Sequence, residues 1–407
     1  MIFLKLAWRN MFRNKRRTFI AGSAIGIGLA SLIFTDAMII GMQENMIRSG
    51  TAPFLGEAQI HAEGFRATRE VENTINNTQS VLHELENDTL VDHSAPRAMG
   101  IGMVTSPANL GQVVIWGIDP EKERYLSKID DAIVEGEYLD TGDKRQILIG
   151  KKLAERLEVG TGDRVVATLA KAKTGELSQE LFRVGGIYHF NIDEFDKGMA
   201  FVTLNKAQDM LGIGDDVHEI AIDLAKGDIV HNKDHPFWDK YSRHGNETAG
   251  WPELLPQFSA ILQMTDLSLI ILAVILFGVV ALGIINTLFM SLYERMFEFG
   301  VMRAVGTRPF ALWRMVVYEA CSLAVLSSIL GIVLGFGITY IVSKTGIDYR
   351  GIEFSGVTIQ ELIYPQLTVS QFIIYPVFVL IFTGIVGMYP ATYAARLNAA
   401  EAMRRSL

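Results

Sequence analysis

Residues 267–293 read LSLIILAVILFGVVALGIINTLFMSLY, and no charged side chain interrupts this run. An α-helix needs about 20 predominantly apolar residues to cross the hydrocarbon core of a bilayer, where it satisfies its own backbone polar groups. Three further runs of this kind lie at residues 18–40, where Asp36 is the only charge, and at residues 320–343 and 362–395. The sequence therefore predicts a membrane protein with four transmembrane helices.

A long hydrophilic insert, residues 41–262, separates the first hydrophobic run from the second. It contains 36 Asp and Glu residues against 22 Lys and Arg residues, an acidity that argues against nucleic acid as a partner. An insert of this length can bury a core of its own. The predicted fold class is therefore an α-helical membrane protein with a 1 + 3 arrangement of transmembrane helices and a large mixed α/β extracytoplasmic domain between the first and second helices.

Within the insert, short apolar or alternating segments predict strands, and helical spacing at residues 76–87 and 151–157 predicts helices. The predicted strands are residues 57–62, 98–104, 112–117, 146–150, 164–170, 181–187, 199–203 and 219–224. A polar excursion at residues 171–180, between two of these strands, predicts a hairpin. We expect the insert to form two lobes, the second at about residues 120–225.

The distribution of basic residues predicts which side of the membrane each segment faces. The first 17 residues hold no acidic residue but six basic ones, namely Lys5, Arg9, Arg13, Lys15, Arg16 and Arg17. Further arginines follow the second and fourth runs, namely Arg295, Arg303, Arg308, Arg396, Arg404 and Arg405. Since short loops rich in Lys and Arg stay in the cytoplasm, both termini are predicted to be cytoplasmic and residues 41–262 to face outward.

These predictions divide the chain into consecutive segments. They are a basic amphipathic cytoplasmic segment (1–17), the first transmembrane helix (18–40), the outward-facing α/β domain (41–262), the second transmembrane helix (264–293), a cytoplasmic helix (294–309), the third transmembrane helix (310–343), a short outer loop (344–369), the fourth transmembrane helix (370–395) and a cytoplasmic tail (396–407).

Glycines mark two of the predicted transmembrane helices. Gly22 and Gly26 form a G-x-x-x-G pair, and so do Gly331 and Gly335. Such pairs allow helices to approach closely, so packing against a partner helix is one interpretation. The alternative is that they carry no special role, because glycine is frequent in membrane helices in general.

Glu319 is an ionisable side chain near the start of the third hydrophobic run, where such a group usually pairs or lines a functional interface. Arg314 on the same helix and Asn286 on the second are the candidate partners, and a solvated carboxylate at head-group depth is the alternative. Three methionines at one-turn spacing are candidates for contact with an acyl chain, with ordinary packing as the alternative. They are Met38, Met42 and Met46.

No catalytic motif is present in the sequence. It contains neither the G-x-x-x-x-G-K-[ST] phosphate loop nor the G-x-S-x-G nucleophile elbow. His231 and His235 have a spacing that two metal ligands on a helix would share, but Pro236 and the polar neighbours favour an exposed loop. Cys321, the only cysteine, lies in the third run, so no disulfide can form within the chain. We therefore predict no catalytic residue, no metal site and no cofactor held by this chain.

Residues 293–314, YERMFEFGVMRAVGTRPFALWR, form the most specific segment of the sequence. Two glutamates one turn apart would share a helix face, a glycine would then permit a sharp break or a close approach, and a second glycine would end the helix. Acidic residues at its start and a basic residue at its end suit the helix dipole. The segment could dock into the cleft of a partner, or it could be a plain connecting loop. The candidate docking residues are Glu294, Arg295, Glu298, Gly300, Arg303 and Gly306.

The residues ERMFEFGVMRAVG at 294–306 resemble the coupling segment of ABC permeases in the superfamily of the lipoprotein-releasing proteins (LolC/LolE), MacB and FtsX. The sequence from Pro390 to Arg404 is similar to the closing segment of these permeases, with Ala399 where they have proline. Residues 171–180 form a shorter hairpin than the proline-containing one with which LolC hooks its periplasmic lipoprotein carrier. The segments that resemble the LolC/LolE branch are residues 117–120, 149–154, 159–165 and 182–187.

The resemblance implies the permease subunit of a type VII, or mechanotransmission, ABC transporter in a bacterial inner membrane, with residues 41–262 in the periplasm. A separate ATPase subunit would hold ATP and magnesium, push on the segment at 294–309, and so drive release or extrusion of a lipoprotein into the periplasm. The expected partners are that ATPase, a second permease copy or paralogue, membrane lipid, and a periplasmic lipoprotein carrier or adaptor. The alternatives are a MacB-type efflux permease for peptides or amphiphiles and an FtsX-like signalling scaffold that controls cell-wall hydrolases.

Overall fold

The computed structural model describes residues 15–51, 54–142, 145–225, 229–230, 232–350, 353–354, 357–358 and 362–396. Most of the predicted amphipathic segment (1–17) and of the predicted tail (396–407) therefore lies outside the described residues. The chain divides into two compact units. We call residues 1–44, 262–349 and 361–407 the membrane unit, and residues 45–261 and 350–360 the outer unit.

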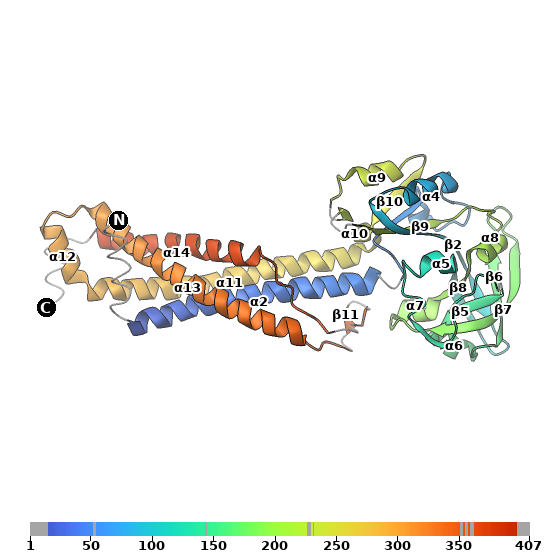
Figure 1. The fold of residues 1–407 in the computed structure, drawn as a ribbon, viewed down its shortest axis with the longest axis horizontal. Coiled ribbons are helices and arrows are strands. Elements are labelled where there is room, and N and C mark those ends of the chain that lie inside the picture. Colours follow the sequence, from blue (N-terminus) through green and yellow to red (C-terminus); the bar gives the residue numbers. More distant parts are fainter. Residues whose placement is uncertain are drawn as a thin grey trace. The chain divides into compact units, whose positions relative to one another are not determined.

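The membrane unit is a bundle of long helices (Figure 1). Each of the four long helices contains a stretch that is long and apolar enough to cross a membrane, which confirms the 1 + 3 arrangement. At 1.5 Å per residue the 37 residues of the first helix extend about 55 Å, so it is longer than the ~30 Å core of a bilayer. The helices are α2 (Lys15–Thr51), α11 (Pro256–Glu294), α12 (Met296–Ala304), α13 (Pro309–Thr345) and α14 (Gln371–Ala395).

The core of the bundle is apolar, as the four hydrophobic runs require. Leu29 and Ile33 of α2 pack with Ile284 of α11, Leu323 of α13 and Val379 of α14 in one buried cluster. Only 11% of the most apolar window of α11 is buried, against 50% for α2. Helix α11 therefore presents most of its apolar surface to lipid or to another helix.

The outer unit is built on one ten-stranded, mostly antiparallel sheet. The strand order is β10-β1-β9-β2-β3-β8-β5-β7-β4, with β6 paired to β2 and β7, and only β3–β8 and β5–β7 are parallel. The strands are β1 (Ala58–Ala62), β2 (Val91–Thr105), β3 (Leu110–Ile118), β4 (Ile133–Gly136), β5 (Gln146–Gly150), β6 (Arg164–Ala170), β7 (Leu177–Tyr188), β8 (Met199–Thr203), β9 (Glu219–Leu224) and β10 (Asn246–Gly250). A separate two-stranded sheet pairs β11 (Glu353–Phe354) with β12 (Val357–Thr358).

Short helices cover the faces and ends of the large sheet. They are α3 (Phe65–Thr68), α4 (Thr78–Glu86), α5 (Pro120–Glu123), α6 (Lys151–Leu157), α7 (Asp193–Gly198), α8 (Leu204–Leu211), α9 (Pro236–Tyr241) and α10 (Trp251–Leu254). All eight predicted strands and the helices predicted at 76–87 and 151–157 are present. Strand β10, with the sequence NETAG, was not predicted, because its polar residues form a strand only through pairing with β1.

The sheet differs from the predicted division of the insert into two lobes. Strands β6 and β8, which belong to the predicted second lobe, pair with β2 and β3, which precede residue 120. Residues 45–261 accordingly fall into a single compact unit. Sequence spacing missed this because long-range strand pairing leaves no local pattern.

A buried ion cluster lies between β2, β9 and α5. Arg97 is 0% exposed and donates to Glu123 at 2.6 and 3.0 Å and to Glu219 at 2.6 Å. Its guanidinium also lies 3.8 Å from the ring centroid of Phe54. Burial raises the pKa of Glu219, and the positive charge of Arg97 opposes this rise. Removing one member of such a buried cluster leaves an uncompensated charge, so the cluster fixes how these three elements meet.

Candidate functional site

Arg295 separates α12 from the long helix that precedes it. Helix α11 ends at Glu294, and Arg295 has φ −109° and ψ 13°, so the chain changes direction before α12 begins. The prediction that Glu294 and Glu298 share one helix face is therefore wrong, because they lie on two different helices. A sharp break at Gly300 is absent as well, because α12 is continuous through this buried residue.

Gly306 ends α12 in a Schellman arrangement. Its φ is 99°, its N–H donates to the Arg303 carbonyl over 3.1 Å, and the Thr307 N–H donates to the Met302 carbonyl over 2.9 Å. The Arg303 guanidinium donates to the Thr307 carbonyl over 3.2 Å, so this arginine stabilises the end of its own helix. Pro309 then starts α13, where its missing N–H costs nothing.

Helix α12 has one buried and one exposed apolar face. Phe299 is 1% exposed and packs in a core with Leu312 of α13 and with α14. On the other side Phe297, Val301 and Val305, spaced four residues apart, are 52%, 40% and 83% exposed. We call these three residues the apolar stripe of α12. A helix that binds in the groove of a partner protein does so through exposed apolar side chains at this spacing.

A buried network, which we call the anchor network, fixes the start of α12. The Arg295 guanidinium donates to the Glu319 carboxylate of α13 over 3.0 Å and to Glu298 of α12 over 3.2 Å. The Ser291 hydroxyl of α11 donates to the other Glu319 oxygen over 2.8 Å. Arg295 and Glu319 are only 6% and 7% exposed, and the Arg295 guanidinium lies 5.0 Å from the ring centroid of Phe299. Ser291, Arg295, Glu298 and Glu319 thus join α11, α12 and α13.

The predicted partners of Glu319 were wrong. Arg314 donates to the Tyr318 hydroxyl over 3.3 Å, and Asn286 is exposed on the side of α11 that faces α2. The sequence contained a hint, because Arg295 is the first basic residue after the uncharged run at 267–293. Its contact with Glu319 depends on the reversals at Arg295 and Gly306, which residue spacing does not reveal.

The two predicted G-x-x-x-G pairs pack against each other within one chain. A β-carbon at Gly331 would lie 2.8 Å from the carbonyl oxygen of Gly26, and one at Gly26 would lie 3.1 Å from that of Ser327. A β-carbon at Gly22 would lie 3.4 Å from the Ser327 hydroxyl, and one at Gly335 would lie 3.2 Å from a side-chain carbon of α2. These four glycines form a glycine seam, which brings α2 and α13 into close contact.

The three predicted methionines have different surroundings. Met38 and Met42 are half-buried and belong to the membrane unit, whereas Met46 is 6% exposed and belongs to the outer unit. Gly41, which lies among them, was not predicted as a site. The Gln366 N–H donates to the Ala37 carbonyl over 2.9 Å, and a β-carbon at Gly41 would overlap the Tyr364 carbonyl. The loop that precedes α14 therefore crosses α2 at Gly41.

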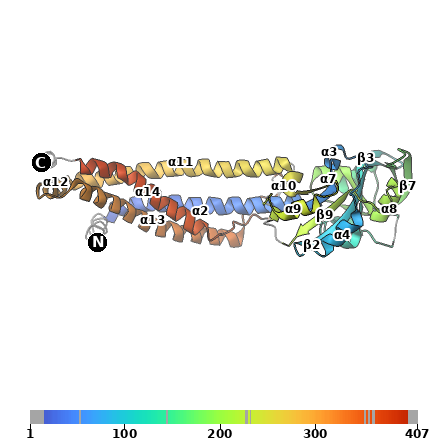
Figure 2. The ribbon, with the colours of Figure 1, turned by 90° about the horizontal axis from the view of Figure 1, so that it is seen from above.

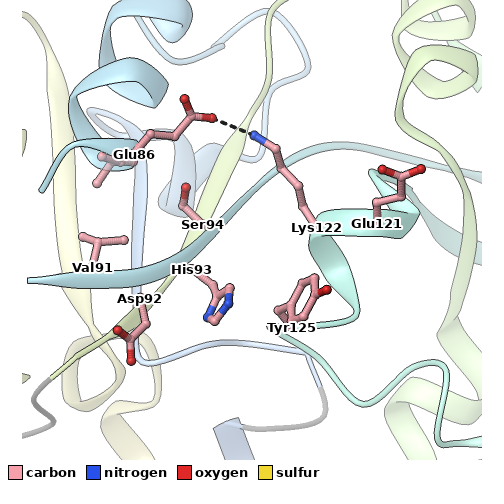
Figure 3. Close-up of a pocket in the computed structure, with 9 residues that line it drawn as sticks. Glu86, Val91, Asp92, His93, Ser94, Glu121, Lys122 and Tyr125 are labelled. Carbon is pink, nitrogen blue, oxygen red and sulfur yellow. Dashed lines mark hydrogen bonds and ion pairs between the residues drawn. The ribbon is translucent and has the colours of Figure 1, made fainter. Parts of the chain in front are cut away.

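The outer unit carries an open pocket of about 390 Å³ between α4, β2 and α5 (Figure 3). His93 stacks on Tyr125 with ring centroids 4.9 Å apart, and Lys122 donates to Glu86 over 3.1 Å. In Figure 3, Asp92 lies beside His93 on the same strand. Within the described part of the chain, no group of three or more His, Cys, Asp or Glu side chains is placed to hold a metal ion.

Two carboxylates near this pocket, Asp223 and Glu57, have raised pKa values. Burial, and after it the charge of Asp92, raises the pKa of Asp223. Burial also raises the pKa of Glu57, as do the charges of Asp223 and Asp92, although its carboxylate accepts a hydrogen bond from the Leu224 N–H over 3.0 Å. His235, whose spacing from His231 was weighed against an exposed loop, caps α9, whereas His231 lies outside the described residues.

A second surface of the outer unit lies on strands β2, β3, β6 and β7. The predicted hairpin is shorter than expected, because residues 177–180 already belong to β7. The five large apolar side chains that these strands expose by 43% to 70% are Ile101, Met103, Leu110, Leu177 and Leu181. Arg164 and Arg183 lie opposite each other on β6 and β7, and both are exposed. We call this surface the outer sheet face; two like charges side by side favour an acidic partner.

Comparison with known proteins identifies both parts of the chain. Residues 18–231 match the MacB-like periplasmic core domain, and residues 270–399 match the FtsX-like permease C-terminal domain. The protein belongs to the MacB/FtsX family of ABC transporter permeases. The FtsX-like match contains the α12 segment, which agrees with the resemblance found in the sequence.

Curated relatives include proteins that align with nearly the whole chain. The lipoprotein-releasing system transmembrane protein LolC of Xylella fastidiosa is 22% identical, with 96% of both chains covered. LolE of Haemophilus influenzae is 20% identical, with 98% of both chains covered. The macrolide export protein MacB 1 of Yersinia pestis is 31% identical over 40% of this chain and 23% of its own length. Among solved structures, the periplasmic region of MacB from Actinobacillus actinomycetemcomitans matches 52% of this chain and 94% of its own at 12% identity, with a TM-score of 0.35.

Proposed function

We propose that this permease is the membrane subunit of a lipoprotein-releasing ABC transporter that works by mechanotransmission, the type VII mechanism. The observation that supports this most is the alignment with LolC and LolE over 96% and 98% of the chain. In this proposal a separate ATPase subunit holds ATP and magnesium, and this chain holds no cofactor. The permease lies in a bacterial inner membrane with both termini in the cytoplasm and the outer unit in the periplasm, in keeping with its basic residues.

The ATPase is proposed to bind the apolar stripe of α12. Phe297, Val301 and Val305 are exposed at one-turn spacing; Glu294 precedes them in sequence, and Glu298 lies directly after Phe297. Burial of one such apolar side chain contributes about 1.5–3 kcal/mol, so the three together are enough to hold a short helix in a groove. The turn at Arg295 and the glycine at Gly306 fix both ends of this helix, so it binds as a preorganised element.

The anchor network is proposed to carry the motion of the ATPase into the membrane. A displacement of α12 acts on Arg295, which is held by Glu319 of α13, and Ser291 of α11 holds the same carboxylate. A buried charge pair resists separation, so α11 and α13 follow α12 instead of sliding past it. Coupling of this kind requires two states that ATP and cargo each bias.

The outer sheet face is proposed to receive the periplasmic partner, a lipoprotein carrier or adaptor. Its exposed Ile101, Met103 and Leu181 form a patch of the kind that soluble surfaces usually reserve for binding. Arg164 and Arg183 give this patch a positive charge within a unit that is acidic overall. A partner with an apolar centre and acidic residues at its rim would complement this face.

The second candidate function is MacB-type efflux of peptides or amphiphiles. It is favoured by the 31% identity to MacB 1 of Yersinia pestis, although that alignment covers 40% of this chain. An FtsX-like scaffold for cell-wall hydrolases is the third candidate. It is favoured only by the match at residues 270–399, which covers α13, α14 and most of α11 but neither α2 nor residues 45–261.

The ATPase contact is tested with the full chain co-expressed with the ATPase encoded beside it and reconstituted in nanodiscs. Val301→Asp places a charge in the middle of the apolar stripe and should weaken the complex at least tenfold, since about 1.4 kcal/mol corresponds to a factor of ten. Val134→Asp, at a valine of the outer unit that is 53% exposed, is the matched control. Unchanged binding and ATP hydrolysis in the Val301→Asp complex would refute the proposed docking.

The cargo and the orientation need separate measurements. A cysteine introduced at Asn109 should react with a membrane-impermeant thiol reagent added from outside to spheroplasts, because residues 41–262 are proposed to be periplasmic. Reaction only after lysis would refute this orientation. Lipoprotein released from proteoliposomes on addition of ATP would support the first candidate function, whereas ATP-dependent export of an amphiphile without lipoprotein release would support the second.

A further inference from the structure

A groove of about 480 Å³ opens between α2 and α11 in the membrane unit, a volume in the range of small-molecule sites. These two helices run along the bundle in opposite directions (Figure 2). Apolar and small residues form most of its walls, and Asn286 and Arg16 supply polar groups. The residues that carry the argument are Arg16, Ile20, Ile25, Val279, Gly283 and Asn286.

The groove changes from polar to apolar along its length. Arg16 lies at the end of the groove near the start of α2, and Ile25 lies nine residues further along, about 14 Å at 1.5 Å per residue. Asn286 of α11 lies about two turns before the end of its helix, and Val279 lies two turns deeper. Along the groove, the guanidinium of Arg16 is followed by the amide of Asn286 and then by an apolar channel. A phospholipid has the matching order of groups: a phosphate, a glycerol ester and an acyl chain.

Two polar groups of the groove lack partners within the described part of the chain. Arg16 is exposed and makes no ion pair there, and the exposed Asn286 amide makes no hydrogen bond there. An amide without a partner at the depth of the acyl chains is costly, and an arginine at the end of a membrane helix attracts an anionic head group. A ligand that brings an anion to Arg16 and a hydrogen-bond acceptor to Asn286 would satisfy both groups.

We propose that this groove binds one anionic phospholipid from the leaflet at the Arg16 end of the bundle. The Arg16 guanidinium donates to the phosphate, and the Asn286 amide donates to an ester carbonyl of the glycerol backbone. One acyl chain lies between Ile20 and Ile25 on one side and Val279 on the other, above the floor that Gly283 leaves open. The lipid would fill the space between the first two membrane helices.

A second copy of the chain is the competing occupant. In a two-fold dimer that buried this groove, the groove of one protomer would face the same groove of the other. Arg16 of each protomer would then lie against the groove residues of its partner. None of the groove residues is acidic, so such a copy would leave both arginines unpaired. The charge of the groove therefore favours a lipid phosphate over a symmetric protein contact.

The proposal is tested by native mass spectrometry of the full chain purified from vesicles of phosphatidylglycerol and phosphatidylcholine in equal amounts. The wild-type chain should retain one phospholipid, with phosphatidylglycerol preferred. Arg16→Gln should lower this preference roughly fivefold, the effect expected for one basic group near an anionic head group. Lys15→Gln removes the same charge one position away, outside the groove, and should leave the preference unchanged.

A second pair of variants tests the apolar part of the groove. Gly283→Leu should abolish retention of either lipid, because it fills the floor, whereas Gly278→Leu on the same helix should not. A β-carbon at either glycine meets nothing within 4 Å, so both variants should fold. Equal preference for phosphatidylglycerol in Arg16→Gln and Lys15→Gln, or equal lipid retention in Gly283→Leu and Gly278→Leu, would overturn the proposal. A wild-type chain that retains no lipid and loses its dimerisation in Gly283→Leu would overturn it as well. The measurement requires neither ATPase nor cargo, so its failure would leave the proposed function untouched.

Discussion

Replacing one partner of the pair Arg295–Glu319 should destabilise the membrane unit more than replacing both. The two side chains are 6% and 7% exposed and lie 3.0 Å apart. Arg295→Met leaves a buried carboxylate that keeps, among the described residues, the hydrogen bond from the neutral hydroxyl of Ser291. Glu319→Leu leaves a buried guanidinium that still contacts Glu298 over 3.2 Å. The first change should therefore be the more harmful one.

The size of the effect follows from the burial of the pair. Breaking a buried ion pair by removing one partner costs about 3–5 kcal/mol, whereas replacing both partners by apolar residues is often close to neutral. We expect a loss of about 4 kcal/mol in Arg295→Met and about 3 kcal/mol in Glu319→Leu, both within this range. The double variant should lose about 2 kcal/mol or less, because no buried charge is left without a partner.

Cys321 provides the assay, because it is the only cysteine and lies two residues after Glu319 on α13. Reaction of its thiol with a fluorogenic maleimide during denaturant titration in detergent reports the unfolding of the bundle. Arg308→Met, which removes an exposed arginine next to α13, is the control and should change stability by no more than about 0.5 kcal/mol. Two observations would refute the reasoning: single variants as stable as the wild type, or a double variant that loses the sum of both single losses.

Three further predictions follow from contacts described above. Gly331→Leu should push α2 and α13 apart and cost about 1–3 kcal/mol in the same thiol assay, whereas Gly337→Leu, where a β-carbon meets nothing within 4 Å, should be neutral. Gly41→Ala should displace the loop that crosses α2, seen as faster backbone hydrogen exchange in residues 362–369 and refuted by unchanged exchange. The raised pKa values of Glu57 and Asp223 mean that the folded chain takes up protons more readily than the unfolded chain, so their contribution to stability grows as pH falls from neutral and is lost as pH rises. Asp223→Asn should weaken this dependence by a few tenths of a kcal/mol, measured as the pH dependence of the fluorescence unfolding midpoint.

The membrane part of the fold was predictable because lipid imposes a simple requirement. A run without charges, such as residues 267–293, has to be a helix if it crosses a bilayer, whatever its neighbours are. The helix ends were less predictable: α11 begins at Pro256, inside a segment that was assigned to the insert. The strands of the insert were found because apolar residues alternate along them, but their order in the sheet depends on pairing between distant residues.

The candidate site was predictable in sequence but not in geometry. The segment at 294–306 was recognised by its residues, and Gly306 ends the helix as expected because a left-handed conformation favours glycine. The contact between Arg295 and Glu319 was missed, because 24 residues and two reversals of the chain separate them. The apolar stripe of α12 was missed as well, since Phe297, Val301 and Phe299 look alike in sequence and differ only in which face is covered.

The glycine seam has a consequence for how this permease family can diversify. Gly26 and Gly331 pack against each other inside one protomer, so these small residues form a contact within the chain and not a contact with a neighbouring subunit. Each polypeptide can therefore complete its own helix core soon after membrane insertion, before it dimerises. After gene duplication, the two paralogues could diverge in sequence on the outward-facing surfaces of their helices and still dimerise, because neither needs the other to complete its core.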